Sequence, residues 1–148
     1  MRERLVDVLE LEWYETGKRI MRKQTRAGKD VAMRFLKESP ALMEGDVLYA
    51  DECTVIVVEI ISCETMVIRM GSVQAVASVC YEIGNRHLPL FYEGDELMAP
   101  FEEPLYRWLE AGGYEVYRVR RKLLYPLRST VAAHVHDGGG LLSKILRG

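Results

Sequence analysis

Features that would assign this 148-residue chain to several common protein classes are missing from its sequence. It has three cysteines, Cys53, Cys63 and Cys80, and no C-x-x-C pair, so the sequence predicts neither a disulfide framework nor a thiolate zinc site. No apolar run approaches the length of a membrane span, and no signal-peptide pattern is present. The net charge of −2 gives no indication of a nucleic-acid or membrane partner. These absences predict a cytoplasmic protein whose free cysteines are small buried hydrophobes.

Motifs of catalysis are also missing. The chain contains no G-x-S-x-G elbow, no phosphate-binding G-x-x-x-x-G-K-S/T loop and no H-E-x-x-H pair, so we expect a protein that is not an enzyme. The run of glycines at 138–140 does not join a strand to a helix and is interpreted as a flexible joint. What is present is 49% hydrophobic and 28% charged residues, which is typical of a soluble globular protein.

The first part of the chain, residues 1–62, is predicted to be a small all-β domain. Residues 5–11 alternate between apolar and polar, which is the period of a half-buried strand. Residues 18–24 and 30–36 indicate a hairpin whose turn requires Gly28. Two further strands are expected at 47–50 and 54–61. Turns spaced this closely favour a sandwich or an open barrel.

Basic residues gather in this first part. They are Lys18, Arg19, Arg22, Lys23, Arg26, Lys29, Arg34 and Lys37. One interpretation is a solvated face whose charges protect edge strands. A second is a docking surface for an acidic partner protein. Nucleic acid is disfavoured because few aromatic residues lie among the charges.

Residues 63–126 show a different pattern. A strand around 66–68, a helix from a Ser72 cap to about Ile83, strands at 88–92 and 96–99, a helix at 103–111 and a strand at 114–121 are expected. Pro104 and Gly112 suit the start and end of the second helix, whose core face is predicted to include Trp108. This β-α-β-β-α-β order predicts a ferredoxin-like domain, so the fold class is α+β. Residues 127–148 are predicted to be a flexible tail that contains histidines.

One stretch, residues 83–91, connects the first helix of this domain to the next strand. Val73, Val76, Ala77 and Cys80 recur at helical spacing, which predicts the buried face of the helix. Gly84 falls where a helix C-cap favours a residue with positive φ. His87 would then leave a packed element in a fixed direction.

The chain has only three histidines: His87, His134 and His136. Neutral imidazole suits nickel, zinc and copper, but a single histidine makes a poor site. A two-fold dimer would bring the same histidine from two chains to one axis. In an extended segment, His134 and His136 would point to the same side and could share a metal, although two solvated tail residues are an equally good interpretation.

Residues 81–87, Tyr-Glu-Ile-Gly-Asn-Arg-His, resemble a signature of the UreE urease accessory proteins, a family of nickel metallochaperones. Residues 11–15 and 28–32 resemble the N-terminal domain of that family, and so does the run at 44–49. The resemblance covers roughly residues 5 to 125. Separated motifs in the same order make it a specific one.

This resemblance implies that His87 binds nickel at a dimer interface, with Gly84, Asn85 and Arg86 as supporting motif residues. It implies delivery of Ni²⁺ to apo-urease and docking of accessory proteins such as the GTPase UreG, while Zn²⁺ or Cu²⁺ would also fit imidazole ligands. Dimers of such chains could pair further. Arg86 is expected to point away from a metal or to pair with Glu82. The rival hypothesis is an adaptor that binds partners through its basic β domain and has no physiological metal.

Overall fold

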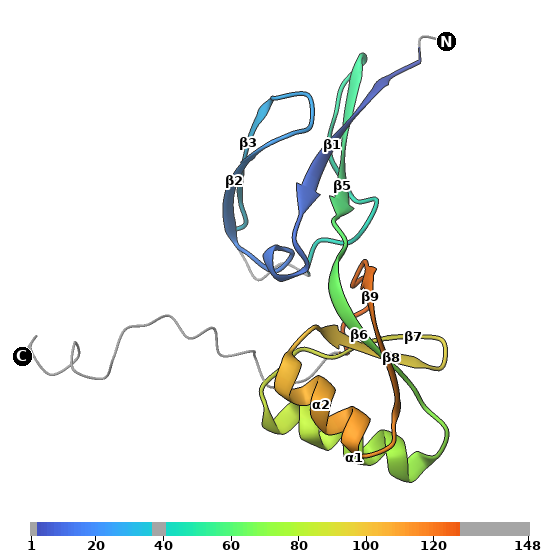
Figure 1. Cartoon of the computed structure of the whole chain (residues 1–148). Helices are drawn as coiled ribbons and strands as arrows, with labels where there is room; N and C mark the ends of the chain where they lie inside the picture. The colour runs from blue at the N-terminus through green and yellow to red at the C-terminus, as the bar shows by residue number, and fades with distance from the viewer. Residues whose placement is uncertain (1–2, 37–40, 128–148) are drawn as a thin grey trace, which may run out of the picture.

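The computed structural model describes residues 3–36 and 41–127. It has an N-terminal part built of strands, followed by a region with the order β-α-β-β-α-β (Figure 1). The α+β fold class predicted from the sequence is therefore confirmed.

The N-terminal part contains a sheet and a separate hairpin. In the sheet, β5 (Thr54–Ile60) lies between β1 (Leu5–Leu11), which runs parallel to it, and β4 (Val47–Ala50), which runs antiparallel. A short 3₁₀ helix, η1 (Trp13–Glu15), follows β1. The hairpin pairs β2 (Ile20–Gln24) with β3 (Asp30–Arg34). Its turn contains Gly28 at φ 84°, as the sequence predicts, because glycine adopts positive φ without steric cost.

Alternation along these strands builds the first core. Every second residue of β5 is buried, and the inner face of the hairpin adds Met21. The buried members are Leu9, Leu11, Met21, Ile56, Val58 and Ile60. Sheet and hairpin thus pack face to face across an apolar layer.

The second part is a four-stranded antiparallel sheet covered by two helices. The strand order is β7 (Phe91–Glu93), β8 (Glu96–Pro100), β6 (Cys63–Arg69) and β9 (Glu115–Arg121). Helices α1 (Val73–Asn85) and α2 (Glu103–Ala111) both lie on the same side of this sheet (Figure 1). This is the ferredoxin-like arrangement.

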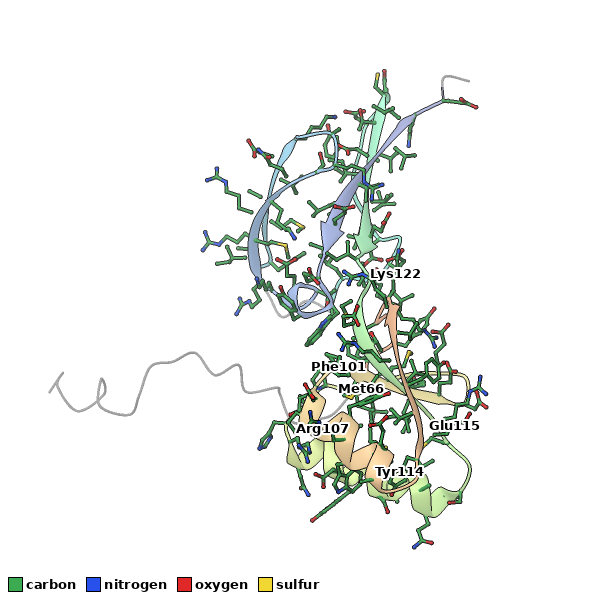
Figure 2. The ribbon with its side chains drawn as sticks, in the orientation of Figure 1. Met66, Phe101, Arg107, Tyr114, Glu115 and Lys122 are labelled. Carbon is green, nitrogen blue, oxygen red and sulfur yellow. The ribbon has the colours of Figure 1, made fainter. Side chains whose placement is uncertain are left out.

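Both faces of the central strand β6 are buried. Met66 and Ile68 pack against the helices with Val79, Ile83, Leu105 and Leu109, and Figure 2 shows Met66 on the side of α2 that faces the sheet. Val67 faces the other way and packs with Phe91, Met98 and Leu123. The sheet therefore has apolar contacts on both sides, which fixes its register.

The buried face of α1 is not the one predicted. Val79 and Ile83 are buried, whereas Val73 is 87% exposed and Ala77 is also exposed. Trp108 was likewise expected in the core of α2 but is partly exposed and stacks on Tyr114. In α1 the apolar residues at helical spacing span more of the helix surface than its sheet covers.

The two parts contact each other at one junction. The Trp13 ring meets the edge of the Phe91 ring at 5.9 Å between centroids. The ammonium of Lys122, labelled in Figure 2, lies 2.8 Å from a carboxylate oxygen of Glu44, and Leu124 packs against the first core. None of the helices in the described ranges is long and apolar enough to cross a membrane.

Candidate metal site at the end of helix α1

Helix α1 begins and ends with defined caps. The Ser72 side chain accepts a hydrogen bond from the Ala75 amide, as predicted. At the other end, the amide of His87 donates to the Gly84 carbonyl at 3.0 Å, and the amide of Leu88 donates to the Ile83 carbonyl at 3.2 Å. These two bonds form a Schellman motif.

The residue with positive φ in this motif is His87, not Gly84. Gly84 lies inside the helix, and His87 has φ 56°. The sequence prediction was wrong because the helix continues to Asn85, two residues beyond the predicted end at Ile83, and the capping position with positive φ follows three residues after Gly84. Among the described residues, His87 is the one non-glycine with positive φ.

A left-handed conformation costs a residue with a Cβ about 1 kcal/mol or more, and glycine is the usual occupant of this position. Histidine is thus a poor choice for the fold at position 87. Strain of this kind persists where the surrounding structure fixes it, and it gathers at functional sites. Leu88 fixes the backbone on the C-terminal side of His87, because it packs against the cluster that contains Ile83. The exposed imidazole of His87 is carried on an anchored backbone.

Arg86 points toward carboxylates. Its guanidinium lies 2.8 Å from Glu82, one turn back on α1, and 3.7 Å from Glu102. Glu102 also caps α2 by accepting a hydrogen bond from the Leu105 amide at 2.8 Å. Arg86 therefore joins the end of α1 to the start of α2, and two carboxylates compensate its charge beside His87.

Asn85 does not cap the helix. Backbone amides of residues 86–88 reach the terminal carbonyls instead, and Asn85 is exposed in the last turn.

An exposed apolar face runs along α1 toward His87. At 100° per residue, Val73, Ala77, Tyr81 and Gly84 fall within one quarter of the helix surface. Val73 is 87% exposed and Tyr81 is 72% exposed. The sequence pattern contained this face, but it was interpreted as the side that packs on the sheet.

The remaining candidate ligands are the three cysteines, which are more exposed than predicted, and the two histidines near the C-terminus. Cys53 is exposed, and Cys63 and Cys80 are half-buried, so none is the fully buried hydrophobe predicted. Burial raises the pKa of the Cys63 and Cys80 thiols, which disfavours the thiolate that binds metal. His134 and His136 lie outside the described residues. Within residues 3–36 and 41–127, no three His, Cys, Asp or Glu side chains gather as a metal site.

Two family profiles match the chain, one over the β domain and one over the ferredoxin-like domain that carries the exposed His87. The chain belongs to the UreE family of urease accessory proteins. The profile of the family's N-terminal domain matches residues 2–61, and the profile of its C-terminal domain matches residues 64–139.

Individual members of this family also match the chain over most of its length. The chain is 46% identical over 144 residues to the urease accessory protein UreE of Flavobacterium johnsoniae, covering 97% of this chain and 87% of that one. It is 44% identical over 131 residues to UreE of Helicobacter pylori, covering 86% and 76%. For UreE of Actinobacillus pleuropneumoniae the identity is 40% over 127 residues, covering 86% and 68%. The chain is therefore a urease accessory chaperone and not an enzyme.

Proposed function

We propose that the protein binds nickel at His87, shared between two chains on a dimer axis, and delivers it for assembly of the urease active site. The observation that carries this proposal is the left-handed conformation of His87. A histidine occupies a capping position where glycine would serve the fold better. Metal binding gives a reason for an imidazole there.

The exposed face of α1 supports the dimer. An apolar helix face left open in one chain is the kind of surface that an isologous interface covers, and this one ends next to His87. Two copies related by a two-fold axis would each contribute one imidazole. Pairing of such dimers into tetramers is compatible with this arrangement.

The chemistry of the site suits a cargo rather than a resident cofactor. Two imidazoles leave most positions around a nickel ion free for further ligands. His134 and His136 are our candidates for those positions. An ion held this way can exchange to a stronger ligand set by stepwise ligand replacement. The same ligands suit Zn²⁺ and Cu²⁺, so nickel delivery depends on more than imidazole affinity.

The N-terminal part is our candidate for partner docking. The outer face of the β2–β3 hairpin presents Ile20, which is 71% exposed, beside the exposed Arg22 and Arg34. Other basic residues of this region are already paired, because Lys23 contacts Glu15 and Arg26 contacts Glu10 and Glu59. A mixed apolar and cationic face suits an acidic partner protein, and UreG and apo-urease are the partners we propose.

Nickel binding to wild type and to two variants tests the proposal. We expect equilibrium dialysis to give one tight Ni²⁺ per dimer for wild type. Both His87→Ala and His87→Gly should lose it while remaining folded dimers by light scattering. Tight binding that survives in both variants would contradict the site and favour the adaptor hypothesis.

A further inference from the structure

A pocket of about 350 Å³ lies between α1 and the β7–β8 hairpin. Its wall on α1 is formed by Val76 and Cys80, and its wall on the hairpin side includes Leu90 and Leu97. Leu127, the last described residue, completes the lining. The pocket is mainly apolar, and since a deleted leucine side chain leaves a cavity of about 150 Å³, it has room for about two aliphatic side chains.

Acidic groups lie on the hairpin side of the pocket and form its rim there. Asp95 and Glu96 line the pocket, and Glu93 is their neighbour at the hairpin turn. Two arginines partly neutralise this group: Arg121 lies 2.6 Å from Glu96 and 3.1 Å from Glu93, and Arg69 lies 3.7 Å from Glu96. Asp95 has no ion pair within the described part of the chain. An apolar occupant with flanking positive charge would match both the pocket and its rim.

The chain itself contains such a segment. Residues 141–147 read Leu-Leu-Ser-Lys-Ile-Leu-Arg. Leu141, Leu142, Ile145 and Leu146 recur at i, i+1, i+4 and i+5, which would place them on one side of a helical turn, with Lys144 and Arg147 on the other. The segment lies beyond residue 139, where the match to the family's C-terminal domain ends.

The chain between Leu127 and this segment is long enough for the segment to reach the pocket. Leu127 itself lines the pocket, so the linking residues have only to form a loop that begins and ends there. Residues 128–140 provide thirteen residues for that loop, which at about 3.3 Å per residue span up to about 43 Å. Closing a loop of this length has a modest entropy cost.

We propose that the pocket binds the chain's own segment at residues 141–147, with Lys144 and Arg147 directed to the acidic rim. Leu90 in the pocket wall is three residues from His87. Docking would thus fasten the far end of the stretch that carries His134 and His136 close to the end of α1. The glycines at 138–140 would serve as the joint between that stretch and the docked segment.

Cys80 allows a direct test, because its thiol is in the pocket wall. We would measure its alkylation by N-ethylmaleimide in the full chain, in EDTA, and identify the modified site by peptide mass spectrometry. If the segment occupies the pocket about four-fifths of the time, it slows the alkylation of Cys80 about fivefold. Leu142→Glu should therefore raise the Cys80 rate about fivefold, since a charge is expelled from an apolar pocket.

Ser143→Gln is the control, because it changes a residue on the polar side of the segment without adding a negative charge next to Lys144 and Arg147, and it should leave the Cys80 rate within twofold of wild type. The exposed Cys53 should react at one rate in all three proteins. Equal Cys80 rates in wild type and Leu142→Glu would overturn the proposal. Protection of Cys80 that disappears on dilution would also overturn it, because the occupant would then be another molecule.

Discussion

The Leu88 amide donates a hydrogen bond to the Ile83 carbonyl at 3.2 Å, and His87 lies inside the turn that this bond closes. The turn requires positive φ at position 87, where glycine is less strained than any residue with a Cβ. We therefore expect His87→Gly to unfold with a free energy about 1 kcal/mol higher than that of His87→Ala. Urea titrations monitored by circular dichroism would measure the difference.

Measuring His87→Gly and His87→Ala side by side separates the role of position 87 in helix capping from its role in nickel binding. Both variants remove the imidazole, so both should lose nickel, and only their stabilities should differ. If His87→Gly proves less stable than His87→Ala, the left-handed turn is not a strained position and the argument for a functional histidine loses its basis.

The exposed face of α1 leads to a second prediction. Ala77→Arg places a charge in the middle of this face, so we expect monomers by sedimentation and the loss of tight nickel binding together. Ser78→Arg adds the same charge on the neighbouring polar side of the helix and should leave both the dimer and the metal site intact. A dimer that persists in Ala77→Arg would place the interface elsewhere.

Arg86 provides a third prediction. Its bridge from Glu82 to Glu102 holds the end of α1, so Arg86→Met should weaken nickel binding about tenfold without removing a ligand. Arg107→Met is the control, because Arg107 also pairs with a glutamate one turn back, Glu103, but lies on α2 (Figure 2). Equal nickel affinity in the two variants would show that the bridge has no part in positioning His87.

Local signals in the sequence predicted much of this fold. Ser72, Pro104 and Gly112 marked helix ends that the structure contains, because capping chemistry depends on neighbouring residues. The parallel pairing that sets Leu5 opposite Thr54 was not predicted. Strand pairing over such a separation depends on the whole fold rather than on either segment.

The candidate site was predicted only in part. The position of His87 after a packed helix is confirmed by the structure, but the helix end itself depends on a tertiary contact, the packing of Leu88 on the cluster around Ile83. Periodicity identified an apolar side of α1 through Val73 and Ala77. It could not show whether the sheet or another molecule covers that side, since both leave the same pattern in a sequence.

The junction of the two parts leads to a last prediction, on pH. Burial disfavours ionisation of Glu44, but hydrogen bonds from Lys122 and from the Ile60 amide outweigh it and hold the pKa of this carboxyl below its ordinary 4.5. A carboxylate whose pKa is lower in the folded state stabilises the protein above the unfolded pKa, and this contribution is lost as the pH falls through the folded pKa. Wild type should therefore be more stable than Glu44→Gln at pH 7, by less than about 1 kcal/mol because the pair is partly exposed, and the difference should shrink between about pH 5 and 3.5. Urea unfolding across this range measures the difference, with Glu110→Gln, an exposed change on α2, expected to follow wild type throughout. A difference between wild type and Glu44→Gln that stays constant down to pH 3.5 would mean that the charge of Glu44 does not stabilise the junction.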